Sequence, residues 1–386
     1  MLRSFANIGW IEERTMDAKT RPVSLLFTVV VLAAATACGP GPSQGADIVL
    51  EPDTDSPAPD SGPSEDTSSD TGMDTSGGGD TSSPTVDEVD PNCVDGKYSE
   101  PLPDPGVDIS SETSSYDSSR VKSFIDSVLD KRYPVGRWLV SQALQKGDSI
   151  DCVERFLRDT SSASSVLNTL STVVHECGHV YDQAVSSFGS STYKITRDVS
   201  FSCPGGDTTD RRGNTFARSR IKNDQYQSEH PPCDGSRGRN CDSYADIYLD
   251  GDPDNDTFEG GDQGFNSVLE ETLQYVNSLA TAYAFQDQLG RRSTSAMDGI
   301  LTFLWYTERY LRMARQDYPD AYSHLTGSSC WRKAILTVWG RAWLMLKAAK
   351  SNDQLGIAEQ KLFQLVRTPE LLKEIERIRQ KHGCRN

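Results

Sequence analysis

The segment from residue 162 to 188 constrains the fold most, because it is predicted to be a long helix that is apolar around much of its girth. One apolar stripe contains Leu170 and Val174, and a second contains Val173 and Cys177, each with neighbours at spacings of three and four. A helix with two such stripes has little surface left for water. We therefore expect it to lie at the centre of a mainly helical domain.

The rest of the chain after about residue 93 is also predicted to be mostly helical. Periodic apolar positions predict helices over 118–145 (interrupted at Pro134), 150–158, 269–285, 295–316, 330–349 and 354–382. Residues 193–201 instead alternate between apolar and polar side chains, which predicts a strand. The segment 189–266 is rich in Gly, Asp, Arg, Asn and Pro and is expected to form a long loop excursion. The expected fold class is mainly α, or α+β with a small β hairpin or strand region.

The first 38 residues have the features of an export signal. Lys19 and Arg21 precede an apolar run over 23–37 that is short for a membrane span. Two acidic residues before position 15 do not suit the basic start of such a signal. We therefore expect the true start to be Met16.

Cys38 follows small residues in the string ATACG. Small residues directly before a cysteine resemble the lipobox of bacterial lipoproteins, which implies cleavage before Cys38 and attachment of lipid to that residue. The alternative is an ordinary secretory signal in which Cys38 has no such role. The resemblance implies an exported protein that lipid anchors to the bacterial cell envelope, at the outer membrane or the cell surface.

Residues 39–92 are expected to form a disordered acidic tether. They contain 13 Asp or Glu residues, no Lys or Arg and no aromatic residue. Such a composition cannot bury enough apolar surface to offset its chain entropy. The formal charge of the whole chain is −17, so the tether accounts for most of it and leaves about −4 elsewhere. The chain shows no basic face that would suit nucleic acid.

Eight cysteines remain when Cys38 is set aside: Cys93, Cys152, Cys177, Cys203, Cys233, Cys241, Cys330 and Cys384. An even number in an exported chain predicts up to four disulfides. Cys233 and Cys241 flank a loop rich in Gly and Arg and could close it locally. The chain has no C-x-x-C spacing, which argues against a zinc ribbon made of cysteines.

The central helix carries His175, Glu176 and His179 in the pattern H-E-x-x-H. Residues four apart on a helix project from the same face, so the two imidazoles can reach one metal ion. Glu176 lies beside this pair, where its carboxylate can take a proton from water. The alternative is a helix whose two histidines bind nothing.

This stretch resembles the zincin metallopeptidases, and the resemblance covers the motif helix and one further helix. Metzincins extend the motif with a glycine and a third histidine, but this chain has Asp182 and Val185 there. Aspzincins carry a later aspartate motif that the string around Asp242 and Asp246 does not match. Gluzincins take a glutamate from a later helix, and the string EETLQYVNSLA, beginning at Glu270, resembles that pattern. The gluzincin-like branch is therefore the expected one.

Two adjacent glutamates compete for the role of third metal ligand. Glu271 shares a helix face with Tyr275 and Ser278 and is preferred, because an aromatic residue four positions beyond the ligand occurs in gluzincin-like families. Glu270 is the alternative. Both could instead be solvated glutamates near the start of a helix.

Four other residues near the motif are weaker candidates. Asp182 could orient His179 from behind, or it could be exposed. His230 could stabilise a developing oxyanion, although an ordinary loop histidine is the simpler interpretation. Tyr275 and Tyr283 are similar candidates. Cys177 is expected to point away from the metal, into the core or a disulfide.

The string DGDPDND over residues 250–256 has oxygen ligands at alternate positions, which suits Ca²⁺. It departs from the EF-hand pattern, because Asn255 stands at the turn glycine and Gly261 at the final glutamate. The alternative is a solvated acidic turn.

Aromatic residues at helical spacings in the C-terminal half are expected in the core, namely Trp305, Tyr306, Tyr310, Trp339 and Trp343. Four charged residues of the same helices are expected to pair on exposed faces: Glu308, Arg312, Arg315 and Arg341.

The expected function is that of an exported, lipid-anchored metallopeptidase whose zinc domain spans residues 93–386. One Zn²⁺ ion would be held by His175, His179 and Glu271, with Glu176 as the catalytic base. The expected partners are protein or peptide substrates, no nucleic acid, and the membrane through the lipid only. The alternatives are an inactive zincin-like surface binding protein and a structural lipoprotein without metal.

Overall fold

The computed structural model describes residues 87–147, 150–187, 189–205, 216–233, 240–249, 263–290 and 294–384. The predicted signal region with Cys38, the tether up to residue 86 and the proposed calcium loop lie outside the described residues. The described chain is mainly helical with one two-stranded antiparallel hairpin, so the predicted fold class is confirmed.

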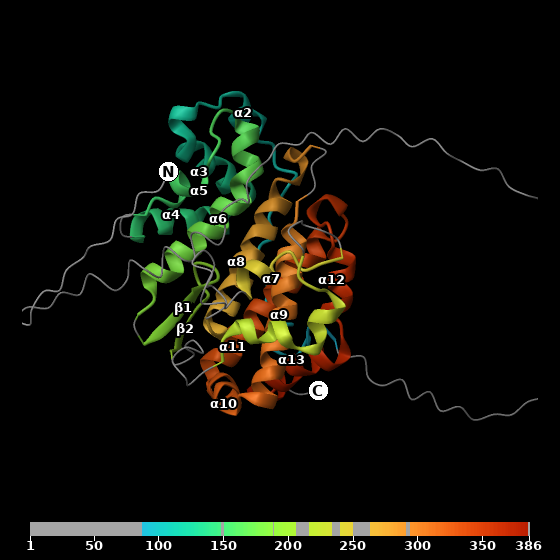
Figure 1. Ribbon diagram of the computed structural model, residues 1–386. Helices are drawn as coiled ribbons and strands as arrows, with labels where there is room; N and C mark the ends of the chain where they lie inside the picture. Colours follow the sequence, from blue (N-terminus) through green and yellow to red (C-terminus); the bar gives the residue numbers. More distant parts are fainter. Residues whose placement is uncertain are drawn as a thin grey trace, which may run out of the picture.

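The longer elements follow one another along the chain, with labels as in Figure 1. They are α2 (Ser110–Ser114), α3 (Val121–Arg132), α4 (Pro134–Lys146), α5 (Cys152–Phe156), α6 (Ala163–Val185), β1 (Ser190–Lys194), β2 (Ser200–Pro204), α7 (Ala245–Tyr248), α8 (Phe265–Ala284), α9 (Ala296–Asp317), α10 (Pro319–Gly327), α11 (Ser329–Ala349), α12 (Glu359–Val366) and α13 (Pro369–His382). Short 3₁₀ turns connect some of them: η1 (Ser118–Arg120), η3 (Arg218–Asn223), η4 (Gln225–Glu229), η6 (Gln286–Gln288) and η7 (Asp353–Leu355).

Helix α6 is the predicted central helix. The hydroxyl of Ser162 caps its N-terminus by accepting a hydrogen bond from the backbone N–H of Ser165. One side of α6 packs against α4 and α5, and another packs against α8 (Figure 1). This double burial is what the two apolar stripes of the sequence predict.

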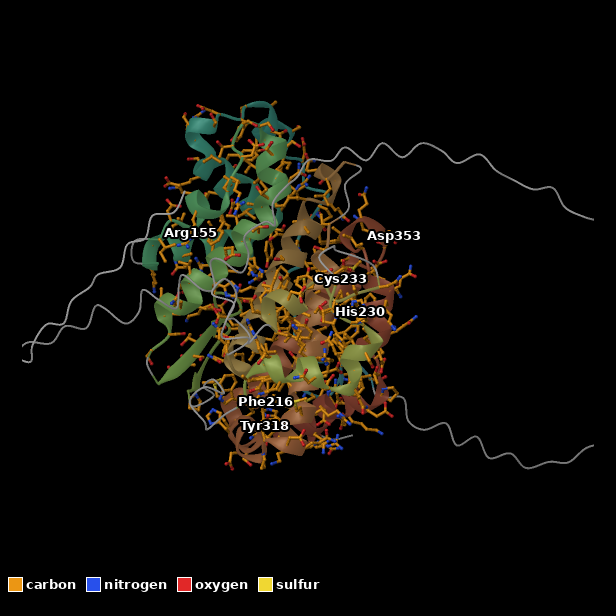
Figure 2. The ribbon with its side chains drawn as sticks, viewed as in Figure 1. Arg155, Phe216, His230, Cys233, Tyr318 and Asp353 are labelled. Carbon is orange, nitrogen blue, oxygen red and sulfur yellow. A yellow bond between two sulfur atoms is a disulfide. The ribbon has the colours of Figure 1, made fainter. Side chains whose placement is uncertain are left out.

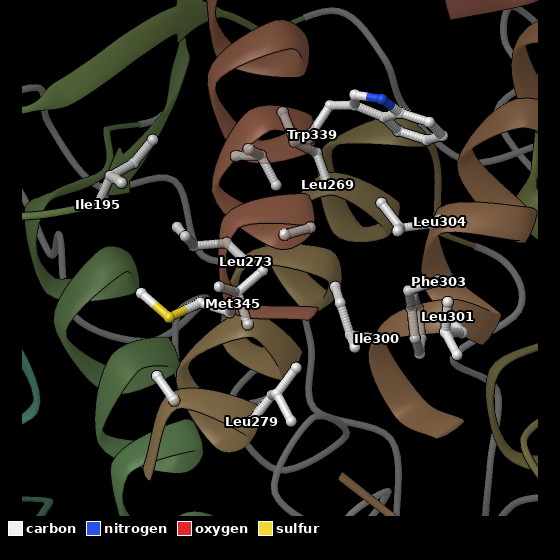
Figure 3. Packing of buried hydrophobic residues seen from close by; sticks show 14 of the residues in the cluster. Ile195, Leu269, Leu273, Leu279, Ile300, Leu301, Phe303, Leu304, Trp339 and Met345 are labelled. Atoms are coloured by element: carbon white, nitrogen blue, oxygen red, sulfur yellow. The ribbon is translucent and has the colours of Figure 1, made fainter. Parts of the chain in front are cut away.

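Helix α8 forms the second layer and lies between α6, α9 and α11. Figure 3 shows Leu269, Leu273 and Leu279 of α8 close to side chains from neighbouring helices. The aromatic residues predicted for the core are all buried: Trp305, Tyr306, Tyr310, Trp339 and Trp343. In the described part of the chain, no helix combines the length and the apolar character that crossing a bilayer requires.

The strand predicted over 193–201 is instead a hairpin. Strands β1 and β2 pair antiparallel with Tyr193 opposite Phe201, and the residues between Lys194 and Ser200 form the turn. The alternation in the sequence continues through this turn, so periodicity alone did not show where the chain reverses.

The single helix predicted over 354–382 is also wrong, because it divides into α12 and α13. Thr368 has an extended backbone (φ −58°, ψ 119°) directly before Pro369, the first residue of α13. A proline disfavours helical geometry at the preceding residue and lacks the N–H that a continuous helix needs.

Four disulfides join the eight cysteines in pairs, as their number predicts: Cys93–Cys384, Cys152–Cys177, Cys203–Cys330 and Cys233–Cys241. The local pair Cys233–Cys241 is the one that the sequence proposed. Disulfides persist in oxidising compartments, so this protein belongs to such a location. Within the predicted loop excursion, Cys203 is bonded to Cys330 of α11, and Phe216 stacks on Tyr318 with ring centroids 4.3 Å apart (Figure 2).

Two of the charged residues predicted for exposed faces are fully buried. Arg341 donates hydrogen bonds to Glu100, Asn277 and the hydroxyl of Tyr133. Glu308 is also buried, and neither of its carboxylate oxygens has a hydrogen-bond partner in the described structure. The apolar character of neighbouring residues, rather than the charge itself, decided which side of each helix faces the core.

Candidate metal centre

His175 and His179 project from one face of α6, as their spacing predicts. Their Nε2 atoms lie 3.1 Å apart, and the two rings meet edge to face with centroids 4.8 Å apart. His175 is 3% exposed, so this is an interior site and not a surface pair. Each ring also has a hydrogen-bond partner for its other nitrogen: Nδ1 of His175 lies 3.1 Å from Ser278 Oγ, and Nδ1 of His179 lies 2.9 Å from Glu270 Oε1.

Helix α8 brings both candidate glutamates to this pair. Oε2 of Glu271 lies 3.6 Å from Nε2 of His175 and 3.3 Å from Nε2 of His179. Glu270 contacts the opposite nitrogen of His179 instead. Consecutive helix residues point in different directions, so one glutamate can join the histidines while its neighbour supports one ring from behind. The group that could hold a metal ion is therefore His175, His179 and Glu271.

The three facing atoms fit the dimensions of a zinc site. In a tetrahedral site with bonds of about 2.0–2.2 Å, any two ligand atoms lie about 3.3–3.6 Å apart. The three separations here are 3.1, 3.3 and 3.6 Å. Oε2 of Glu271 is buried and accepts a hydrogen bond from neither imidazole, so its lone pairs are not otherwise used. The donor set of two imidazoles and one carboxylate is also one that suits Zn²⁺.

The electrostatics of the group favour a cation. Burial alone lowers the pKa of His179, but the neighbouring charges of Glu271 and Glu270 outweigh burial and hold that pKa well above its usual range. Burial raises the pKa of Glu271, but the charge of His179 and the closeness of both imidazoles outweigh burial and lower that pKa. Each partner thus stabilises the charged form of the other, and a metal ion bound by His179 would replace a proton beside the carboxylates of Glu270 and Glu271.

Gly178 allows α8 to come this close to the motif. A Cβ atom at this position would lie 1.8 Å from Oε1 of Gln274, which is not physically possible. Gln274 cannot easily turn away, since its amide nitrogen donates to Asp182 and its oxygen accepts from Asn277. Gly178 therefore permits the close packing of α6 against α8.

Asp182 does not orient His179, as one reading of the sequence proposed. It is buried and accepts hydrogen bonds from the backbone N–H of Lys194 at 2.7 Å and from Gln274 at 3.0 Å. Burial raises the pKa of Asp182 well above its usual range. Asp182 therefore joins α6 to β1 and α8, while Glu270 is the residue that contacts the back of His179.

Cys177 points away from the histidines, as expected, and is bonded to Cys152. This disulfide joins α5 directly to the turn of α6 that carries the motif. It forms one side of the site's framework and has no part in the metal group.

Glu176 lies in the wall of a cleft of about 560 Å³. The cleft runs along α6 past His175 and is bordered on its other side by α7, α8, the start of α9 and the residues before α12. Glu176 is 2% exposed, and its Oε1 atom has no hydrogen-bond partner among the described residues. A buried carboxylate oxygen with an unused lone pair, beside the metal group and in a cleft, is suited to accept a proton.

Three tyrosines form the wall nearest His175. The ring of Tyr275 lies edge to face with the His175 ring at a centroid distance of 4.7 Å, and its hydroxyl lies 2.9 Å from that of Tyr248. Tyr244 packs edge to face on Tyr275 and also lines the cleft. Tyr283, the other tyrosine singled out in the sequence, is not among the residues that line the cleft.

His230 also lines the cleft and is 2% exposed. Burial lowers its pKa, although Asp242 acts in the opposite direction. Its imidazole is therefore neutral at neutral pH. It lies with Cys241 and Ser243 at the part of the cleft formed by the loop excursion, and among the described residues no contact places it against the metal group.

Sequence reasoning gave no role to three residues of this site: Ser278 as a partner of His175, Tyr248 as a partner of Tyr275, and Arg158 in the cleft wall. Ser278 could have been found, because it lies seven residues, two helical turns, after Glu271 and so shares its face. Tyr248 belongs to the four-residue helix α7 and Arg158 to the segment between α5 and α6, and both are too short or irregular for periodicity to place them.

Comparisons with known proteins do not identify the chain: no family model, no curated protein and no solved structure matches it. The functional conclusion therefore rests on the geometry of His175, His179, Glu271 and Glu176.

Proposed function

We propose that this protein is a zinc-dependent metallopeptidase that hydrolyses peptide bonds in other proteins or peptides. The observation that carries the proposal is the triangle of Nε2, Nε2 and Oε2 atoms from His175, His179 and Glu271, whose sides of 3.1–3.6 Å are close to those of a zinc tetrahedron. The cleft beside it supplies room for a chain of amino acids, and Glu176 supplies a base.

Glu176 performs the proton transfers in this mechanism. Its Oε1 atom accepts a proton from a water molecule as the water oxygen attacks the scissile carbonyl carbon. When the C–N bond breaks, the same carboxyl group gives that proton to the leaving amine. The immediate products are a carboxylic acid and an amine, and transfer of the acid proton to the amine gives a carboxylate and an ammonium group, so atoms and charges balance without a further reactant.

The bound Zn²⁺ ion would supply Lewis acidity, which lowers the pKa of water and polarises a carbonyl group. The protein's part is to fix the ligands before the ion arrives. Ser278 and Glu270 hold the two imidazoles by their Nδ1 atoms, which directs both Nε2 atoms toward Glu271. The tyrosines exclude water from one side of the cleft.

We further propose that the protein is exported and held at the bacterial cell envelope through lipid on Cys38, with residues 39–92 as a tether. The four disulfides support an exported protein. Mass analysis of the mature N-terminus tests the anchor, because an unmodified Cys38 would contradict it.

The peptidase proposal is tested by metal analysis together with cleavage of a broad peptide library by wild type and Glu176→Gln. Both proteins are expected to bind one zinc ion, since Glu176 is not in the metal group. Only wild type is expected to cleave. A zinc-loaded wild type that cleaves nothing would instead identify an inactive zincin-like binding protein, and a protein that binds no zinc would leave the histidines a structural role.

A further inference from the structure

The cleft follows α6 for a length that suits several substrate residues. Asn168, Thr169 and Thr172 of α6 line it together with His175 and Glu176. Asn168 lies seven residues before His175, which is about 10 Å along a helix. An extended peptide covers that length with about three residues. The cleft can therefore bind a substrate well beyond the bond that is cut.

Arg158 is the one lysine or arginine among the described residues that line this cleft. It is exposed and has no ion pair with any described residue. The acidic residues in the same walls are Glu176, beside the metal group, and Asp298, whose oxygens accept hydrogen bonds from the backbone of Ile357 and Ala358. Away from the metal group, Arg158 is therefore the only Lys or Arg among the described lining residues that can offer a substrate carboxylate a positive charge.

The path of the chain places Arg158 away from the motif. Helix α5 starts at Cys152, which is bonded to Cys177 beside the metal group, and the chain then returns to Ser162 at the start of α6. Arg158 lies between these two points, so it borders α6 near Asn168 and Thr169, with which it shares the cleft wall. The disulfide at one end and the helix cap at the other hold this segment against α6.

The two ends of the cleft therefore differ in chemistry. Near the metal group the wall consists of Tyr244, Tyr248 and Tyr275. Toward the N-terminus of α6 it includes Arg158, the ring of Phe156, the amide of Asn168 and the hydroxyl of Thr169. An arginine flanked by neutral hydrogen-bonding side chains is suited to bind a carboxylate, because its planar fork can donate two parallel hydrogen bonds.

We infer, on the basis of the proposed peptidase function, that Arg158 determines specificity by binding a carboxylate of the substrate about three residues from the scissile bond. The carboxylate can belong to an acidic side chain or to the C-terminus of the peptide. The protein therefore prefers acidic peptides over basic ones of the same length.

This inference is tested with series of peptides that share one defined cleavage site. In each series one position, up to four residues from that site, carries Glu, Gln or Lys. A further pair of peptides ends near the cleavage site, one with a free C-terminal carboxylate and the other with an amide. This pair distinguishes binding of a terminal carboxylate from binding of an acidic side chain. Wild type is expected to cleave one set of acidic peptides with a kcat/KM roughly three- to tenfold above that for the Lys counterparts. That preference should shrink in high salt.

Arg158→Glu is expected to reverse the preference, while Arg158→Lys retains it in part. Arg155→Glu is the matched control. Arg155 lies three residues earlier on α5, is equally exposed and is not among the cleft-lining residues, so this variant should behave as wild type (Figure 2). Binding of the same peptides to zinc-loaded Glu176→Gln gives a second measurement that does not need catalysis, and acidic peptides should bind severalfold more tightly.

A preference for the free acid or for internal Glu would each support the inference and would identify the source of the carboxylate. Cleavage without any difference between Glu and Lys peptides would overturn it and leave the peptidase proposal intact. A preference that Arg158→Glu does not alter would do the same. A zinc-loaded wild type that cleaves no peptide would overturn the proposed function and this inference with it.

Discussion

Oε1 of Glu270 lies 2.9 Å from Nδ1 of His179, and Oε2 of Glu271 lies 3.3 Å from Nε2 of the same ring. Two consecutive glutamates of α8 thus contact the same imidazole, each at a different ring nitrogen. Only Glu271 also approaches His175, at 3.6 Å. We therefore expect Glu270→Gln and Glu271→Gln, which are chemically identical substitutions, to affect zinc binding differently.

Glu271→Gln is expected to abolish stoichiometric zinc binding, because it removes one of three ligand atoms and the charge that balances the ion. Glu270→Gln should keep one zinc per chain but weaken its affinity by roughly 10- to 100-fold, as removal of a partner behind a ligating histidine typically does. The measurement is zinc content after dialysis, followed by competition with a chelator. Equal zinc loss in both variants, or in neither, would contradict the assignment of Glu271.

Much of the fold could be predicted from the sequence, because long helices have a strong periodic signal. Helix α6 begins and ends within a few residues of the predicted segment, and Pro134 separates α3 from α4 as expected. Shorter elements such as α7 and α10 escaped prediction, since four to nine residues carry little periodicity. Tertiary packing also overrode charge at Glu308 and Arg341, which a single sequence cannot reveal.

The candidate site was partly predictable for a similar reason. His175, Glu176 and His179 lie within five residues, so helix geometry alone brings them together. The choice between Glu270 and Glu271 depended on how α8 is rotated against α6, which the sequence indicates only through shared faces. Arg158 and His230 reach the cleft from irregular segments, and their contribution emerges only from the folded chain.

Gly178→Ala is expected to destabilise the protein and weaken the metal site together. The new methyl group would overlap Gln274, so α6 and α8 must separate or Gln274 must break its bonds to Asp182 and Asn277. Overpacking of this kind costs about 1–3 kcal/mol in the free energy of unfolding, measured by urea denaturation.

Gly327→Ala is the control for this substitution, because a Cβ atom there meets no atom within 4 Å. It should leave both stability and zinc affinity unchanged. Shortening the obstructing side chain with Gln274→Ala should recover part of the packing loss in the double variant. If Gly178→Ala alone has wild-type stability and zinc affinity, the helices do not pack as closely as described.

The four disulfides should contribute unequally to stability. Cys93–Cys384 spans 291 residues, whereas Cys233–Cys241 spans 8. In the chain-entropy model, removal of the long bridge costs about 6 kcal/mol and removal of the short one about 2.5 kcal/mol. Paired Cys→Ala variants, compared by urea denaturation under non-reducing conditions, check this order. A short bridge that matters more than the long one would show that loop entropy does not determine their effects.

Glu308 should make the protein less stable as the pH rises. Its carboxyl group is fully buried without hydrogen-bond partners in the described structure, and burial, assisted by the charge of Glu374, raises its pKa well above the usual range. The folded protein therefore keeps a proton that the unfolded chain releases above a pH of about 4.3. Between that value and the raised folded pKa, this residue lowers the free energy of unfolding by about 1.4 kcal/mol per pH unit.

Glu308→Gln removes the titration while keeping the shape of the side chain, so it should be more stable than wild type at pH 8. The two proteins should become equal near pH 4, where both side chains are neutral in either state. Glu374→Gln is the matched control, and it should be less stable than wild type at pH 8, because Glu374 accepts hydrogen bonds from Arg315 at 2.8–3.2 Å. Urea denaturation of the three proteins across this pH range provides the measurement. A difference between wild type and Glu308→Gln that does not grow with pH would mean that Glu308 is ionised in the folded protein and has a partner for its charge.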